Sequence, residues 1–193
     1  MSLLPGASSA SHFPQSATGW AGAECRLWRG VGSRLALSYR AFLAGAAAGG
    51  CLAIDDHTRI AYCEILHSER KEECAAFLRR ACAWYREQGF VVERVLTDNA
   101  KAYHSHFWRD TCAELQIERR YTRPYSPWTN RKAEALIKTL LREWAYRFAY
   151  PTSAHRSRAL SGYLRWYNRR RPHGSLGARP PISRVSQVCG QYG

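Results

Sequence analysis

The chain has 193 residues, of which 46% are hydrophobic, and a formal net charge of +14. That length suits one well-buried domain, or one domain plus an extension, and the hydrophobic content argues against a disordered chain. The uncharged run 41–54 is shorter than the roughly 20 apolar residues of a membrane span, and residues 1–20 lack the pattern of a secretory signal, so we expect an intracellular protein without a membrane segment.

Residues 1–50 differ in character from the rest of the chain. They are rich in Gly, Ala, Ser and Arg and show no sustained hydrophobic period, apart from a short strand-like run around Leu35–Tyr39. We interpret them as an irregular extension. From Cys51 onward, "CLAI" and "IAYCEIL" flank the turn-forming "DDHTR", which predicts a β-hairpin. Asp55 and Asp56 are therefore expected to form the turn rather than to be catalytic.

A helix and a buried strand are predicted next. Ser68 can cap a helix that runs to about Gln88, and Gly89 is placed to end it. The apolar residues inside this helix recur at helical spacing: Phe77, Leu78, Ala81 and Tyr85. The run "FVVERVL" then reads as a strand that ends immediately before Thr97 and Asp98.

The second half of the chain is predicted to be mainly helical. A helix from about Ser105 to Leu115 is followed by a short strand, "IERRY", and by a Pro-rich loop, "TRPYSPWTN". The next helix begins near Arg131, and a last helix spans about His155–Arg169. The residues predicted to face inward are Phe107, Trp108, Thr111, Cys112 and Leu115 in the first helix and Ala133, Ile137, Leu140 and Trp144 in the second.

These elements predict an α/β fold with a mixed sheet, because a helical crossover between the hairpin and the Asp98 strand implies parallel pairing. Ligands of such sheets gather beyond the carboxyl ends of the strands, where Asp98 is expected. Glu134 lies near the start of a helix, on the same side as Arg131 and Lys138. It could face a ligand, although its spacing alone favours a surface ion pair with Lys138.

The basic excess is confined to the C-terminal third. Residues 119–184 contain 16 of the 29 Lys and Arg residues but only two of the 15 acids. A solvated helix face usually mixes both signs, whereas a one-sided basic surface with interleaved aromatics is typical of a nucleic-acid partner. The aromatic residues are Tyr121, Tyr125, Trp128, Trp144, Trp166 and Tyr167.

Cysteine and histidine give little sign of a metal site. The seven cysteines are odd in number and contain no C-x-x-C pair, which argues against a disulfide framework and a zinc site. We expect reduced, mostly buried thiols. His104 and His106 could form a metal pair, but Ser105 between them favours a loop or a helix cap.

Four ordered blocks carry a family resemblance: "AIDDHTRIAYCEIL", "VERVLTDNAKAY", "TRPYSPWTNRKAEALIKTLLREWAY" and "WYNRRRPHGSLGARPPISR". Over about Cys51–Val188 they resemble the retroviral-integrase-type catalytic core of bacterial insertion-sequence transposases. The resemblance implies a ribonuclease-H-like fold, DNA cleavage and strand transfer, and three carboxylates (Asp, Asp and Glu) that hold two Mg²⁺ or Mn²⁺ ions. By position, Asp98 matches the second carboxylate and Glu134 the third.

The resemblance also implies partners. DNA is the expected substrate, and the candidate DNA-binding residues are Arg131, Lys132, Lys138, Arg142, Arg169, Arg170 and Arg171. A homo-oligomer or an intact transposase is a further possible partner, because joining two DNA ends needs two active sites. We expect a cytoplasmic, nucleoid-associated bacterial protein that does not bind membranes.

The chain departs from the family pattern at the first carboxylate, which normally lies on a strand upstream of the hairpin in an H-x-D-x-K-like setting. No aspartate precedes Asp55, and the surroundings of Glu24 do not match that strand. Ala100 and Arg131 also stand where the family usually has glycine. We expect the first strand to be missing, or to be replaced by Leu35–Tyr39 or a partner.

The expected organisation has three parts: an extension (1–50), an incomplete integrase-like core (51–150) and a C-terminal basic helix and tail (151–193). Because one of three carboxylates is absent, our hypothesis is a truncated or frame-disrupted transposase that is inactive by itself. The alternatives are a non-catalytic nucleic-acid-binding fragment and an unstable pseudogene product.

Overall fold

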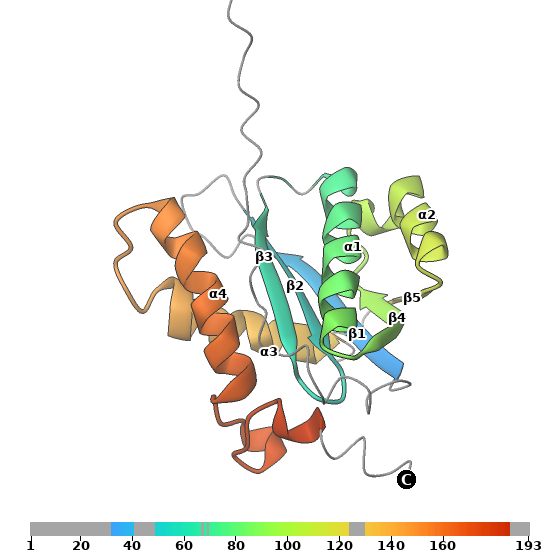
Figure 1. The fold of residues 1–193 in the computed structure, drawn as a ribbon. Helices are drawn as coiled ribbons and strands as arrows, with labels where there is room; N and C mark the ends of the chain where they lie inside the picture. Colours follow the sequence, from blue (N-terminus) through green and yellow to red (C-terminus); the bar gives the residue numbers. More distant parts are fainter. Residues whose placement is uncertain (1–31, 41–48, 67, 69, 124–129, 186–193) are drawn as a thin grey trace, which may run out of the picture.

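The computed structural model describes residues 32–40, 49–66, 68, 70–123 and 130–185. Five strands form one mixed sheet in the order β3-β2-β1-β4-β5 (Figure 1). The strands β1, β2 and β3 are antiparallel neighbours, whereas β4 runs parallel to β1 and β5 runs parallel to β4. Their bounds are β1 Gly32–Arg40, β2 Gly49–Asp55, β3 Ala61–Leu66, β4 Val91–Thr97 and β5 Glu118–Tyr121. The predicted ribonuclease-H-like mixed sheet is confirmed.

The first strand of the sheet is present. β1 contains the short run around Leu35–Tyr39 and lies at the centre of the sheet, paired with both β2 and β4. Its side chains alternate between the two faces, so that Leu35 and Leu37 join one apolar cluster and Ala36 joins the other. Residues 1–50 therefore contribute a strand to the core. The predicted domain boundary at residue 50 falls inside β2, so it does not separate the sheet from the N-terminal segment. Residues 1–31 lie outside the described part of the chain.

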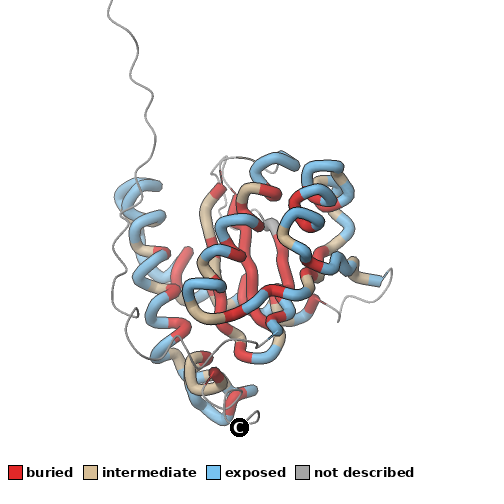
Figure 2. The backbone as a smooth tube through the Cα atoms, turned by 45° about the vertical axis from the view of Figure 1, so that its right-hand side comes forward, coloured by how far each residue is buried: buried red, intermediate tan, exposed pale blue. Residues whose placement is uncertain are grey.

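Helices cover both faces of the sheet (Figures 1 and 2). One face carries α1 (Lys71–Glu87) and α2 (His106–Glu114), which share an apolar cluster with β1 and β4. The other face carries α3 (Arg131–Leu140), its π-helical continuation Leu141–Ala145 and α4 (Ser153–Arg169), which packs along β3. The predicted stripe Ala133, Ile137, Leu140 and Trp144 is buried in this second cluster.

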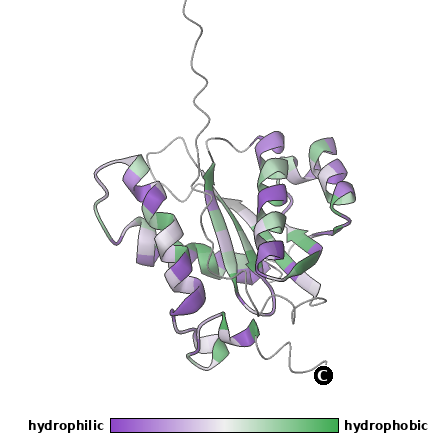
Figure 3. Ribbon diagram, in the orientation of Figure 1, coloured by the Kyte–Doolittle hydropathy of each residue, from purple (hydrophilic) through white to green (hydrophobic). Residues whose placement is uncertain are grey.

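Hydropathy along the elements agrees with this packing. Figure 3 shows hydrophobic residues concentrated in the central strands, and alternating hydrophobic and hydrophilic bands along α1 and α4. Such banding is expected of helices that bury one side against a sheet.

Several local predictions are confirmed and two are wrong. Gly89 has a positive φ of 87° directly after the end of α1, and Ser105 caps α2 by accepting a 3.2 Å hydrogen bond from the backbone N–H of Trp108. The predicted cap Ser68 is wrong, because α1 begins at Lys71 with Arg70 as its N-cap residue. The prediction that Phe107 faces inward is also wrong. Adjacent residues of a helix point in different directions, and next to the buried Trp108 the side chain of Phe107 points toward solvent, with Phe107 48% exposed.

The five described cysteines are buried and form no disulfide with one another, as expected for reduced thiols. None of the described helices is long and apolar enough to cross a membrane. Of the predicted Pro-rich loop, residues 124–129 lie outside the described residues.

Candidate active site and basic cleft

Asp98 lies at the carboxyl end of β4, immediately after the last strand residue, Thr97. Its side chain is half-buried, and its Oδ1 accepts a 3.1 Å hydrogen bond from the backbone N–H of Ala100. The next residue, Asn99, donates from Nδ2 to the carbonyl oxygen of Thr122 at 3.1 Å, which ties this turn to the segment after β5. Asp98 therefore forms a turn and also stands at the end of the sheet where a ligand is expected.

Ser38 is the residue of β1 that comes level with Asp98. The parallel register pairs Ala36 with Leu96, and two residues further along both chains lead to Ser38 and Asp98. Because side chains alternate along a strand, Ser38 shares the face of Ala36, which packs against the α3 cluster. Ser38 is 3% exposed. At the place beside Asp98, the central strand thus presents a hydroxyl group and not a carboxylate.

Glu134 projects from the first turn of α3, which packs across β1 and β2. The start of the helix is held over the middle of β1, where Asn130 Nδ2 donates to the Leu37 carbonyl at 3.4 Å. Two residues along an α-helix turn the side chain by about 200°, so Glu134 and Lys132 lie on opposite flanks. Lys132 reaches Asp56, in the turn after β2, at the far end of the sheet from Asp98. Glu134 therefore lies on the flank of α3 opposite the one that faces Asp56.

The described residues do not complete a metal centre. Among them, no group of three or more His, Cys, Asp or Glu side chains could hold a metal ion. Mg²⁺ and Mn²⁺ are bound chiefly by carboxylate oxygens, and a neutral serine hydroxyl supplies none of the negative charge of the expected third carboxylate. The two-ion site implied by the family resemblance does not fit the described residues. His104 stacks on the ring of Tyr121, with 4.5 Å between the ring centroids, which favours the loop interpretation of His104 and His106.

The predicted DNA-binding residues fall into two groups. The exposed group consists of Arg131, Lys138, Arg142, Arg169 and Arg170. The other two cations, Lys132 and Arg171, are half-buried and engaged within the domain. Lys132 forms an ion pair with Asp56 and donates to the Asp56 carbonyl at 2.9 Å. Arg171 binds both carboxylate oxygens of Glu143, each at 2.6 Å.

The ion pair with Arg171 shifts the pKa of Glu143. Hydrogen bonding from Arg171 lowers the pKa of Glu143 from 4.5 to about 2, and the hydroxyl of Tyr163, 3.1 Å from Oε2, adds to the effect. Both side chains are largely shielded, with 17% of the Arg171 side chain and 20% of the Glu143 side chain exposed. The pair joins the π-helical turn after α3 to the segment that follows α4.

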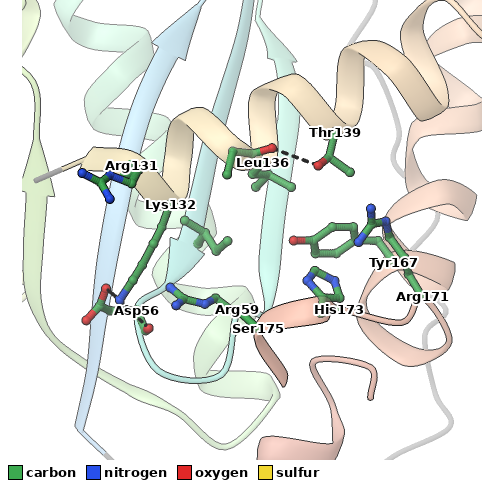
Figure 4. Close-up of a pocket in the computed structure, with 12 residues that line it drawn as sticks. Asp56, Arg59, Arg131, Lys132, Leu136, Thr139, Tyr167, Arg171, His173 and Ser175 are labelled. Carbon is green, nitrogen blue, oxygen red and sulfur yellow. Dashed lines mark hydrogen bonds and ion pairs between the residues drawn. The ribbon is translucent and has the colours of Figure 1, made fainter. Parts of the chain in front are cut away.

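A basic cleft of about 550 Å³ opens on the flank of α3 that carries Lys132 (Figure 4). It lies between the β2–β3 turn, the first turns of α3 and the segment after α4. Its charged and polar lining includes Asp56, Arg59, Arg131, Lys132, Arg171, His173 and Ser175. Sequence reasoning missed Arg59, His173 and Ser175, because their spacing contains no signal that they meet.

Two family models, both described as integrase core domain, match this chain over residues 47–127 and 115–181. Together they extend from β2 to the segment after α4. The chain is also similar to two Escherichia coli proteins, the transposase InsD for insertion element IS2A/D/F/H/I/K and the transposase InsD for insertion element IS2D of strain K12. Each is 31% identical over 92 residues, which is 48% of this chain and 31% of the relative. The matched region thus spans about a third of the length of these curated relatives.

Proposed function

The chain contains an integrase core domain of the type found in bacterial insertion-sequence transposases, whose family models match residues 47–181, and from this premise we propose that the protein is a DNA transposase core that binds DNA but is impaired in DNA cleavage and strand transfer. The proposed impairment rests on Ser38, which the register of β1 and β4, continued two residues beyond the pair Ala36–Leu96, aligns with Asp98. On this register we place the first carboxylate of the H-x-D-x-K-like strand at Ser38, and Ser38→Asp tests that placement.

The basic surface supports binding to DNA. Exposed cations extend over α3 and its continuation, with Lys138 and Arg142, and over the end of α4, with Arg169 and Arg170. Neutralising DNA phosphates releases counterions, so such a surface gives an affinity that falls steeply with salt concentration. A DNA partner would place the protein in the cytoplasm, on the nucleoid. We further propose a homo-oligomer or an intact transposase as a protein partner, because two DNA ends need two active sites.

The loss of one carboxylate accounts for the proposed impairment. In a complete site, two divalent ions held by three carboxylates supply Lewis-acid activation of a water or a DNA 3′-hydroxyl and stabilise the leaving oxygen. Here Asp98 and Glu134 remain, and Ser38 adds no negative charge.

The proposal is tested by separating DNA binding from DNA chemistry. We expect the purified protein to bind a labelled duplex with the same affinity in Mg²⁺, in Mn²⁺ and in chelator at matched ionic strength. In the same buffers, a supercoiled plasmid should remain unnicked and no strand-transfer product should form. Metal-dependent nicking that disappears in Asp98→Asn would overturn the impairment, and a failure to bind the duplex at low salt would overturn the DNA partner.

A non-catalytic nucleic-acid-binding fragment predicts the same results with the unaltered protein. The two candidates separate on Ser38→Asp: a core that has lost one ligand should gain metal binding, whereas a surface that only binds nucleic acid should not. An unstable pseudogene product would be recognised by the absence of a cooperative thermal unfolding transition.

A further inference from the structure

The basic cleft is separate from the Asp98 end of the sheet. The β2–β3 turn contributes Asp56 and Arg59, and Asp55, the last residue of β2, pairs with Leu35 near the start of β1. Asp98, by contrast, follows the end of β4, which runs parallel to β1. The two sites therefore lie at opposite ends of the strands. Figure 4 shows Arg59, Lys132 and His173 directed into the space between the turn, α3 and the segment after α4.

The cleft carries more positive charge than its acids compensate. Four of its lining residues are Arg or Lys: Arg59, Arg131, Lys132 and Arg171. Asp56 pairs with Lys132, and Glu143 pairs with Arg171. Arg59 and Arg131 form no ion pair with any acid in the described part of the chain. Two positive charges thus remain for a ligand.

Two buried nitrogen atoms of the cleft residues have no hydrogen-bond partner within the described part of the chain. They are Nη1 of Arg59 and Nε2 of His173, both shielded from solvent and unpaired within the described residues. A buried polar atom without a partner is costly, so native structures nearly always pair such atoms with protein, water or a ligand. The guanidinium group is especially suited to phosphate oxygens, because its planar N–H groups can bind two of them at once.

His173 is held in a form that can complete such a site. Burial, followed by the charge of Arg171, lowers the pKa of His173 from 6.5 to about 4, so the ring is neutral at pH 7. Its ring packs edge-on against Tyr167, with 4.7 Å between the centroids, which fixes its orientation. A neutral imidazole protonated on Nε2 can donate one hydrogen bond from this atom without adding charge.

The backbone conformation of the β2–β3 turn fixes the position of Arg59. Arg59 has a positive φ of 68°, which is uncommon for a residue with a side chain. The turn is stabilised by the buried Asp55, which accepts 2.7 Å hydrogen bonds from the backbone N–H and the hydroxyl of Thr58 and from the hydroxyl of Ser33. A rigid turn therefore presents the Arg59 side chain to the cleft.

We propose that this cleft binds a phosphate group through Arg59 and His173, with the exposed Arg131 adding positive charge at its rim. The phosphate could belong to a DNA backbone or to a free phosphate-containing solute, because both present the same tetrahedral anion. The binding of inorganic phosphate does not depend on the proposed transposase function, whereas the DNA form of the inference rests on it.

The first experiment uses inorganic phosphate as the probe, titrated calorimetrically into the full chain in chelator at constant ionic strength. We expect Arg59→Gln to weaken the association constant by at least about tenfold, because a charge-assisted hydrogen bond is lost. Arg158→Gln, which removes an exposed cation of α4 outside the cleft, should leave it unchanged. If Arg59→Gln fails to fold, the exposed Arg131→Gln gives the readout. Phosphate binding that is insensitive to both cleft variants, or equally weakened by Arg158→Gln, would overturn the inference.

The second experiment identifies the source of the phosphate. Duplex affinity is measured at several salt concentrations for the unaltered protein, Arg59→Gln and Arg158→Gln. If the cleft holds a DNA phosphate, the slope of log affinity against log salt should fall by about 0.9 in Arg59→Gln. If only phosphate binding weakens and the slope is unchanged, the ligand is a free solute. Arg59-dependent phosphate binding without any duplex binding would support the cleft and contradict the proposed function.

Discussion

Arg171 and Glu143 form a bidentate ion pair across 28 residues of sequence, with Nε and Nη2 of the arginine each 2.6 Å from a carboxylate oxygen. The pair links the π-helical turn after α3 to the segment after α4, and the guanidinium also lies 5.7 Å from the ring centroid of Tyr167. Sequence reasoning assigned Arg171 to DNA, which stays a prediction. In the structure this cation pairs with Glu143 and borders the basic cleft.

We expect Glu143→Gln to destabilise the protein by about 2 kcal/mol. Removing one partner of a buried pair costs roughly 3–5 kcal/mol, and the partial exposure of these side chains reduces that figure. For a chain of this size the melting temperature should fall by about 4–8 °C. Thermal unfolding at pH 7 measures the change. The matched control is Glu87→Gln, at an exposed position of α1, and an equal loss in both variants would contradict a specific role for Glu143.

The same two regions should govern the response to acid. Glu143 has its pKa lowered to about 2, so the unfolded chain takes up its proton first and stability is lost as the pH falls from 4.5 toward 2. His173 has its pKa lowered to about 4, so below pH 6.5 the unfolded state binds a proton that the folded state does not. Stability should therefore also fall between pH 6.5 and 4.

Denaturant unfolding at a series of pH values separates these contributions. His173→Gln should flatten the dependence between pH 6.5 and 4, and Glu143→Gln should flatten it between 4.5 and 2. A stability that rises as the pH is lowered through either window would contradict the assignment, because both shifts give the folded state fewer bound protons.

The exposed cations on α3 and its continuation lead to a prediction about salt. Lys138→Gln combined with Arg142→Gln should weaken duplex binding and reduce the slope of log affinity against log salt by up to about 1.8, if each residue contacts one phosphate. Arg86→Gln, on α1 over the opposite face of the sheet, is the matched control. A duplex affinity unaffected by the double substitution would remove this surface from the DNA path.

The parts of the molecule that the sequence predicted are those with local patterns. The hairpin, β4 and the α3 stripe each carry a period of their own, which placed Asp98 at a strand end and Glu134 near a helix start. The proposed roles of these two carboxylates came from the family resemblance. The strand β1 was only a weak signal at Leu35–Tyr39, because a central strand is buried on both faces and depends on pairing with residues far along the chain. Arg59 and His173 meet only through the tertiary fold, so no spacing could place them in one cleft.

The charge count favours a nucleic-acid partner but does not distinguish individual cations. Lys132 and Arg171 contribute to the basic excess in the same way as Arg131 and Lys138, yet Asp56 and Glu143 neutralise them in the structure. The formal charges in a sequence do not show which cations form ion pairs with acids far along the chain. Predictions of DNA-binding residues from composition therefore need the partner acids before individual positions can be ranked.

Ser38→Asp tests the proposed origin of the impairment most directly. It places a carboxylate level with Asp98, on the face of β1 that packs against α3, and so restores a set of three carboxylates. Without metal, a buried carboxylate beside Asp98 should lower the melting temperature, because like charges repel and desolvation is unfavourable. With Mn²⁺ at about 100 times its dissociation constant, metal binding should raise the free energy of unfolding of Ser38→Asp by about 2.7 kcal/mol. This corresponds to an increase of about 5–11 °C in melting temperature.

The matched control is Ser38→Asn, which has a similar shape and no charge. Melting temperatures of both variants are compared in chelator and in Mn²⁺, and a plasmid-nicking assay follows in the same buffers. Stabilisation by Mn²⁺ should appear in Ser38→Asp, be absent in Ser38→Asn and disappear when Asp98→Asn is added. If the two Ser38 variants respond identically to Mn²⁺, Ser38 does not occupy the place of the missing ligand, and the absence of nicking must then arise elsewhere in the domain.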